Sequence, residues 1–171
     1  MKHVHGGCPE HYLKRFGLSQ KGIIDFSINI NPLGPPPLIE RLWSRILKKI
    51  RLYPSIDGEG IRVFYKKRFH IPDEFILPGN GSTEIIYLLP RSLPIESILI
   101  AKPSYFDYER ASILAGKEII NIYMDPTEEP DNIKEGIISR LNKADALWIG
   151  RPNNPTGHIL PKEMIQEISE D

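Results

Sequence analysis

Two polar stretches of the sequence carry residue types that could bind a small molecule, and one of them follows an apolar run near residue 150. Residues 146–149, Ala-Leu-Trp-Ile, predict a short buried strand. Residues 151–157, Arg-Pro-Asn-Asn-Pro-Thr-Gly, cannot extend it, because proline lacks a backbone N–H and the flanking dipeptides favour turns. In open α/β sheets ligands bind where buried strands end, so the Asn154 amide is a candidate ligand-binding group. A strand-to-helix turn without a ligand is the alternative.

The second stretch, residues 79–84, reads Gly-Asn-Gly-Ser-Thr-Glu and has the composition of an anion site. Residues 74–78 predict a short strand before it, and residues 82–90 predict a helix after it. A glycine-rich turn that enters a helix presents free N–H groups and the positive end of the helix dipole. With the hydroxyls of Ser82 and Thr83 beside Gly81, the turn can bind a phosphate group. A capped turn without a ligand is the alternative.

The elements that must position these residues alternate along the chain. Strands are predicted over 96–101 and 116–123, and helices over 35–51, 60–70, 131–141 and from 161 onward. This alternation predicts an α/β fold with three layers, α/β/α, and a mainly parallel sheet. Residues 22–31 alternate between apolar and polar side chains, so we expect Ile28 and Ile30 to pack while Asn29 points at a substrate. An amphipathic edge strand is the alternative there.

Composition excludes several classes of function. The 22 basic and 22 acidic residues cancel, which leaves no electrostatic footprint for nucleic acid or an anionic membrane. The apolar runs are far shorter than the roughly 20 residues of a membrane helix. Residues 3–11 hold three histidines and the single cysteine, but their spacing matches no common zinc motif, so no metal is expected. One cysteine and no apolar leader favour the cytoplasm.

Taken together, the two stretches resemble those of the fold-type-I pyridoxal-phosphate enzymes, the aminotransferase class I/II family. Residues 153–157 resemble its Asn-Pro-Thr-Gly signature, which implies that Asn154 donates to the phenolic oxygen of pyridoxal 5'-phosphate (PLP). The resemblance also implies that Gly81, Ser82 and Thr83 bind the cofactor phosphate. Tyr105, in the Pro-Ser-Tyr of residues 103–105, would stack on the pyridine ring; a helix-capping aromatic is the alternative.

A fourth cofactor contact is implied by Leu-Tyr-Pro at residues 52–54, which resembles a segment of the family that precedes a helix. Tyr53 would then cross a dimer interface and bind the cofactor phosphate of the other subunit. A turn tyrosine that packs on Pro54 is the alternative.

Two further segments are similar to those of one branch of the family, the threonine-phosphate decarboxylases of cobalamin biosynthesis. They are His-Gly-Gly at residues 5–7 and Asp-Phe-Ser-Ile-Asn-Ile-Asn-Pro-Leu-Gly at residues 25–34. The resemblance implies that His5, Gly6, Asn29 and Asn154 contact the substrate, although residues 3–11 could also be a mobile tail. It implies PLP-dependent decarboxylation of L-threonine O-3-phosphate to (R)-1-amino-2-propanol phosphate. The histidinol-phosphate aminotransferases, which the second segment resembles more loosely, are the alternative.

The resemblance implies residues that this sequence does not contain. The Schiff-base lysine and the aspartate that pairs with the pyridinium nitrogen are expected beyond Asp171. We therefore interpret residues 1–34 as an N-terminal arm with a substrate-contacting segment and residues 35–171 as an incomplete PLP-binding large domain. Such a chain is expected to be inactive alone, whether its full-length enzyme is a homodimer or a partner chain supplies the C-terminal half. A non-catalytic half and a free-standing binder of phosphorylated ligands are further alternatives.

Overall fold

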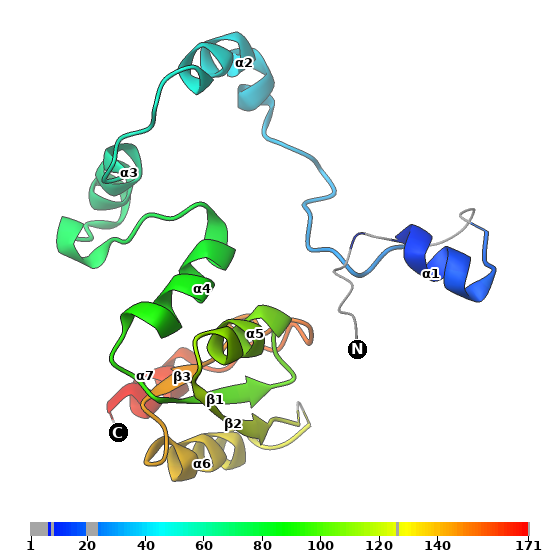
Figure 1. Ribbon diagram of the computed structural model, residues 1–171, viewed down its shortest axis with the longest axis vertical. Coiled ribbons are helices and arrows are strands. Elements are labelled where there is room, and N and C mark those ends of the chain that lie inside the picture. Colours follow the sequence, from blue (N-terminus) through cyan, green and yellow to red (C-terminus); the bar gives the residue numbers. More distant parts are fainter. Residues whose placement is uncertain (1–6, 8, 20–23, 126, 171) are drawn as a thin grey trace. The chain divides into compact units, whose positions relative to one another are not determined.

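The computed structural model describes residues 7, 9–19, 24–125 and 127–170 (Figure 1). The chain divides into two compact units, Met1–Pro54 and Ser55–Asp171. The division into an arm over residues 1–34 and a large domain over residues 35–171 stays a prediction. Within the described residues, none of the helices combines the length and the apolar character needed to cross a membrane.

The first unit holds two helices, α1 (Pro9–Phe16) and α2 (Pro37–Ile50). Helix α2 confirms the prediction over residues 35–51, and it begins with Pro37 in its first turn, where a missing N–H costs no hydrogen bond. Helix α1 was not predicted. Among the described residues of this unit, Leu13 of α1 is the only buried hydrophobic side chain. Among the described residues of its own unit, the apolar stripe of α2 therefore has no buried core to pack against.

The segment between these helices departs from the sequence-based expectation. Residues 24–30 form no strand, and the side chains of Phe26 and Ile30 are 89% and 73% exposed. The expectation that the isoleucines pack was therefore wrong for Ile30. An alternating pattern forms a strand only when a second strand satisfies its backbone N–H and C=O groups. No such partner strand is present in the described part of the first unit.

The second unit contains a parallel sheet of three strands, β1 (Ser97–Lys102), β2 (Glu118–Tyr123) and β3 (Ala146–Trp148), in the order β2-β1-β3. The register places Leu99 of β1 opposite Ile120 of β2 and Leu147 of β3. The three strands predicted after residue 95 are thus confirmed. Strands β1 and β3 run parallel as neighbours, so the loops that follow them emerge at the same edge of the sheet.

Helices cover both faces of this sheet, as Figure 1 shows for α5 and α6. On one face, Leu99 and Ala101 of β1 share a buried cluster with residues of α6 (Pro130–Leu141) and α7 (Lys162–Glu170). On the other face, the Trp148 indole N–H donates to Ser112 Oγ of α5 (Phe106–Leu114) at 3.3 Å, and α5 packs against α4 (Gly81–Ser92). The predicted three-layer α/β/α arrangement is confirmed.

Two local predictions in this unit were wrong. Residues 74–78 form no strand; a 3₁₀ turn, η1 (Asp73–Phe75), precedes extended residues that pair with no strand among those described. The predicted stop of α4 at Pro90 also fails, because the helix continues to Ser92 with Pro90 buried inside it. A proline inside a helix removes one backbone hydrogen bond. In α4 the ring of Pro90 is buried despite this loss.

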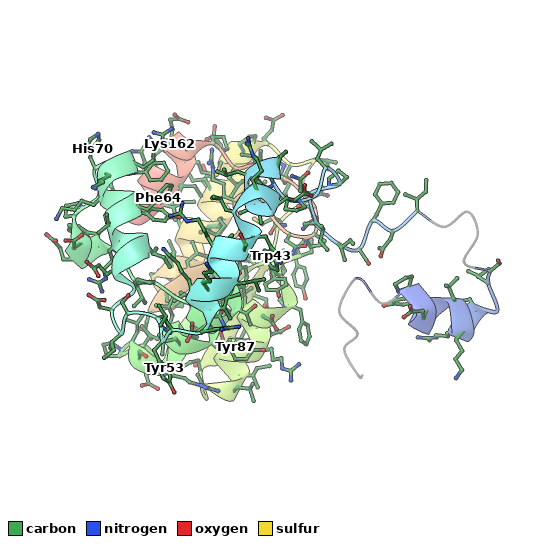
Figure 2. All side chains as sticks on the ribbon, turned by 90° about the horizontal axis from the view of Figure 1, so that it is seen from above. Trp43, Tyr53, Phe64, His70, Tyr87 and Lys162 are labelled. Carbon is green, nitrogen blue, oxygen red and sulfur yellow. The ribbon has the colours of Figure 1, made fainter. Side chains whose placement is uncertain are left out.

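Helix α3 (Glu59–Phe69) was predicted over residues 60–70 and carries an aromatic cluster. The ring of Phe64 lies 5.5 Å from that of Tyr65 and 6.1 Å from that of Phe69, both edge to face (Figure 2 labels Phe64). His70 ends the helix with a φ of 56°, in the left-handed region. The rings of this cluster remain about half exposed, so α3 presents an apolar face to its surroundings.

Candidate functional site

The loops after β1 and β3 are joined by one buried side chain. Asn153 is 5% exposed, and its Nδ2 donates to the carbonyl oxygen of Pro103 at 2.8 Å. The same amide nitrogen donates to Thr156 Oγ1 at 2.9 Å. Because Pro103 follows β1 and Asn153 follows β3, these bonds hold the carboxyl-end loops of two neighbouring strands together.

The loop that carries Asn153 is tightly closed. The Asn153 N–H donates to the His158 carbonyl at 2.8 Å, and the Gly157 N–H donates to the Asn153 carbonyl at 2.7 Å. A Cβ on Gly150 would lie 3.3 Å from both Cα and Oδ1 of Asn153, so the backbone approaches that side chain closely. Asn153 Oδ1 is buried and has no hydrogen-bond partner among the described residues. The site therefore retains one unused acceptor.

The N-terminus of α4 forms the anion-binding part of the site. The carboxylate of Glu84 accepts the N–H of Asn80, the N-cap residue. The N–H groups of the first turn, at Gly81, Ser82 and Thr83, have no acceptor within the helix because no carbonyl precedes them at the right spacing. A Cβ on Gly79 would lie 2.6 Å from Ile85 Cδ1, so the Ile85 side chain packs closely against the turn. The result is a compact turn with free donors.

An aromatic stack extends from this region toward the sheet. Tyr105 is the N-cap residue of α5, and its ring meets that of Tyr108 edge to face at 5.8 Å. Tyr108 in turn stacks on Trp148 of β3 with ring centroids 5.0 Å apart and parallel planes. Tyr105 thus contacts Tyr108, and Tyr108 contacts Trp148. The three rings form a partly buried aromatic surface at the carboxyl edge of the sheet.

Asp107 connects this aromatic surface to α4. Its side chain is 3% exposed, and its Oδ1 accepts the Tyr87 hydroxyl at 3.0 Å. A hydrogen bond to Asp107 raises the pKa of Tyr105, burial adds to the rise, and a hydrogen bond from Thr83 opposes it. Burial raises the pKa of Tyr87, and the hydrogen bond to Asp107 adds to that effect. The hydrogen bond between Tyr87 and Asp107 therefore joins α4, which carries the anion turn, to the first turn of α5, which follows Tyr105.

The structure brings some of the predicted site residues together. Gly81, Ser82 and Thr83 begin α4 and Tyr105 precedes α5, and these two helices pack against each other. Asn154 lies in the loop that Asn153 ties to Pro103, and its own side chain is exposed. Of the adjacent asparagines it is thus Asn153 that is buried, a role that the sequence did not assign.

The remaining predicted residues belong to the first unit or lie outside the described residues. Tyr53 is fully exposed (Figure 2), and Asn29 is exposed as well. His5 and Gly6 fall outside the described residues. Their neighbour Gly7 donates its N–H to Ser27 Oγ at 2.9 Å, which places Gly7 beside the 25–34 segment.

Sequence reasoning missed two groups at this site, Tyr87 and Asp107. The helix dipole by itself explains an aspartate in the first turn of a helix such as α5. A tyrosine within an apolar helix such as α4 is typical of a core position. Thr83 and Tyr87 are four residues apart and therefore lie on the same face of α4. This spacing was the sequence signal that could have pointed to Tyr87 as a polar group near the anion turn.

Comparison with known proteins shows the family of this chain. The sequence pattern described as aminotransferase class I and II matches residues 21–170. The chain belongs to this family. It is 32% identical over 170 residues to the threonine-phosphate decarboxylase of Salmonella typhimurium, covering 98% of this chain and 46% of that protein. The family's enzymes depend on PLP.

Solved structures agree on the fold. The histidinol-phosphate aminotransferase of Clostridium acetobutylicum matches with a TM-score of 0.74 and 32% identity, over 86% of this chain and 43% of that one. The L-threonine-O-3-phosphate decarboxylase of Porphyromonas gingivalis matches with a TM-score of 0.73 and 27% identity, over 87% and 43%. The chain spans about half the length of the relatives it matches.

Proposed function

We propose that this chain forms the phosphate- and ring-binding side of a PLP-dependent decarboxylase that acts on L-threonine O-3-phosphate. The observation that carries the proposal is the convergence of three segments at one edge of the sheet. Asn153 ties the loop after β3 to the loop after β1, and the hydrogen bond from Tyr87 to Asp107 ties α4 to the first turn of α5, next to Tyr105. An anion turn, an aromatic surface and an asparagine-rich loop thereby become neighbours.

The residues of this edge fit the chemistry of PLP. The first-turn N–H groups of α4 and the Ser82 hydroxyl would hold the phosphate. The Tyr105 ring would lie against the pyridine and exclude water from its face. The Asn154 amide would donate to the phenolic oxygen without titrating near neutral pH. The unpartnered Oδ1 of Asn153 shows that the site has polar capacity which the described residues do not use. PLP, when bound, supplies the electron sink that makes loss of the substrate carboxylate feasible.

The choice of substrate rests on the first unit and on the relatives. The N–H of Gly7 donates to the hydroxyl of Ser27, so Gly7 lies beside the segment that holds Asn29. Glycines allow backbone N–H groups to approach an anion, and an asparagine amide can donate to a carboxylate. The match to the Salmonella decarboxylase covers 98% of this chain and supports this substrate. The Clostridium match favours the second candidate, a histidinol-phosphate aminotransferase.

A second chain is part of the proposal. In α2 the side chains of Trp43, Leu47 and Ile50 are 51%, 46% and 67% exposed, and Trp43 is labelled in Figure 2. A helix with such a stripe gains stability only when another apolar surface covers it. A second copy in a homodimer, or a partner chain that carries the C-terminal half of the fold, would supply that surface.

Titration of the purified chain with PLP tests the proposal. We expect saturable binding, weakened about tenfold by Ser82→Ala, which removes a hydroxyl donor to a charged phosphate. Ser139→Ala, which removes an exposed hydroxyl of α6 on the opposite face of the sheet, is the control. Absence of saturation in the wild-type chain would refute the proposed cofactor site.

Trapping with borohydride and activity assays test the remaining parts. Lys102 adjoins the loop after β1, but its ammonium is paired with Glu109 at 2.6 Å. We therefore expect scattered lysine labelling and no CO₂ release from O-phospho-L-threonine by the chain alone; stoichiometric labelling of one lysine would contradict this. Supplied with the remaining half of a family member, the chain should release CO₂. Amino transfer from histidinol phosphate to 2-oxoglutarate would favour the aminotransferase instead.

A further inference from the structure

A chain of hydrogen bonds in the first unit joins Gly7 to residues 25–27. The N–H of Gly7 donates to Ser27 Oγ at 2.9 Å, across 20 residues of sequence. Ser27 is in turn bonded to Asp25, whose Oδ1 lies 2.5 Å from Ser27 Oγ and 2.8 Å from the Ser27 nitrogen. The three residues are exposed, and their bonds link two separate segments of the chain.

The chemistry of these groups fixes the direction of each bond. A carboxylate only accepts, so the Ser27 hydroxyl donates its single proton to Asp25, and its oxygen accepts the N–H of Gly7. The bonds from the hydroxyl and then the N–H of Ser27 lower the pKa of Asp25, so this carboxylate is charged at neutral pH. A charged acceptor makes a stronger hydrogen bond than a neutral one. Asp25 therefore fixes the orientation in which the Ser27 oxygen faces Gly7.

A steric contact places Gly7 at the same position as the hydrogen bond does. Its φ of +79° lies in the left-handed region that favours glycine, and a Cβ on it would lie 2.9 Å from Ile28 Cγ2. The backbone of Gly7 therefore lies against Ile28 as well as against Ser27. Ile28 directly precedes Asn29, whose side chain is exposed. Two independent observations thus place Gly7 next to the segment that carries Asn29.

We propose that Ser27, oriented by Asp25, is a positioning residue that holds Gly7 beside Asn29, so that the His5–Gly6 pair and Asn29 meet the substrate as one unit. The inference rests on the proposed function, in which these residues contact the phosphorylated substrate. Ser27 itself does not touch the substrate; it acts through Gly7. Because the N–H of Gly7 is bonded to Ser27, it is not available to an anion, and the anion-binding N–H of the pair is assigned to Gly6.

The contacts of Ser27 support this role over that of a local turn. An Asx turn needs only the N–H of Ser27 on the Asp25 carboxylate, and it uses neither the Ser27 hydroxyl nor Gly7. An exposed N–H also bonds to water, so the bond from Gly7 is not needed to satisfy a buried donor. The bond orders a segment instead, and a segment that is already ordered loses less entropy when a ligand binds.

Exchange of the Gly7 N–H with water measures this anchor without cofactor or substrate. Residues 6 and 7 are the only Gly-Gly pair in the sequence. In a full chain made with glycine labelled at both its carbonyl carbon and its nitrogen, Gly7 therefore has the only amide in which the two labels are bonded, and magnetic resonance detects it alone. Ser27→Ala should raise its exchange rate about fivefold, the worth of one hydrogen bond. Ser27 is not a sequence neighbour of Gly7, so the intrinsic exchange rate stays the same.

Matched variants separate the Ser27 hydroxyl from its surroundings. Ser27→Thr keeps the hydroxyl and should restore the wild-type exchange rate. Asp25→Asn keeps an acceptor oxygen but removes its charge, so the rate should rise about two- to threefold, less than in Ser27→Ala. Ser44→Ala, which removes an exposed hydroxyl of α2 in the same unit, is the control and should leave the rate unchanged.

Substrate kinetics test the positioning role itself. In the enzyme assembled with the remaining half of a family member, Ser27→Ala should raise KM for O-phospho-L-threonine about three- to tenfold. The value of kcat and the affinity for PLP should stay within about twofold, because the change affects the ordering of a substrate-binding segment and not the reacting groups. Ser27→Thr should restore KM, and Ser44→Ala should leave it unchanged.

The possible outcomes decide the question. An unchanged exchange rate in Ser27→Ala, or an unchanged KM beside a raised exchange rate, overturns the positioning role. Parallel losses of kcat and PLP affinity also overturn it, because they indicate a general folding defect. If the assembled wild-type enzyme releases no CO₂, the proposed function fails, and the exchange rate alone decides whether Ser27 holds Gly7. A raised rate then supports the anchor, and an unchanged rate overturns it.

Discussion

Replacement of Asn153 tests whether one buried amide holds the two carboxyl-end loops together. Asn153→Ala removes the Nδ2 donor from the Pro103 carbonyl and from Thr156 Oγ1. The adjacent Asn154→Ala is a matched control, because that side chain has the same chemistry and is exposed. Both changes lie in the same loop, so differences between them report on burial and hydrogen bonding alone.

The magnitude follows from the contacts. Loss of the two hydrogen bonds of Asn153 costs about 1 kcal/mol each, while removal of its buried, unpartnered Oδ1 returns about 1 kcal/mol. The net loss for Asn153→Ala is therefore about 1–2 kcal/mol, against less than about 0.5 kcal/mol for Asn154→Ala. Asn153→Asp should cost about 3 kcal/mol or more at pH 7, because a buried carboxylate would face the Pro103 carbonyl.

The pH dependence of Asn153→Asp has a definite sign. Burial beside a carbonyl raises the pKa of the introduced carboxyl in the folded state above its unfolded value of about 4. The folded state then binds the proton more tightly, so the variant loses stability as pH rises above about 4. Asn153→Ala should show no such extra dependence.

Urea unfolding followed by tryptophan fluorescence measures these differences. The chain has two tryptophans, and Trp43→Phe leaves Trp148, which lies on β3 just before the loop, as the only reporter. Midpoints at pH 4 and pH 7 would give the change in the free energy of unfolding, provided that the slopes agree. If Asn153→Ala and Asn154→Ala unfold at the same midpoint, Asn153 does not join the loops and the assembled site is refuted.

Three further outcomes are expected. Gly58→Ala should lower stability by about 1–2 kcal/mol in thermal unfolding, because the residue has a φ of +66° and a Cβ would meet the Pro78 ring at 2.6 Å; Gly60→Ala, which meets nothing within 4 Å inside α3, should be neutral or stabilising. Asp145→Asn should lower the melting temperature at pH 7 but not at pH 2, because bonds from the N–H groups of residues 96 and 97 lower the pKa of Asp145. That stability is present above the unfolded pKa and is lost as pH falls through the folded one, so equal melting temperatures at pH 7 would contradict it. Asn154→Ala should weaken PLP binding with no change in unfolding midpoint, and a shift in both would indicate a structural role instead.

The elements that local pattern alone specifies were predictable. Strands β1 and β2 and helix α6 appeared within one or two residues of their expected bounds, since hydrophobic periodicity and flanking turn residues act over a few positions. Residues 74–78 and 24–30 carry strand-like patterns too, but no described strand pairs with them. A strand depends on a partner that lies elsewhere in the chain or outside it, and periodicity contains no information about that partner.

The sequence by itself determined the glycine-and-hydroxyl turn before α4, the asparagine-proline loop after β3 and the tyrosine at the start of α5, because backbone chemistry dictates each of them locally. Only the tertiary structure decided which of two adjacent asparagines is buried. It also placed the buried Asp107 of α5 within hydrogen-bond distance of Tyr87 of α4. These contacts arise where α4 packs against α5 and where β1 and β3 end side by side, and packing between distant segments leaves no periodic trace in the residues that make it.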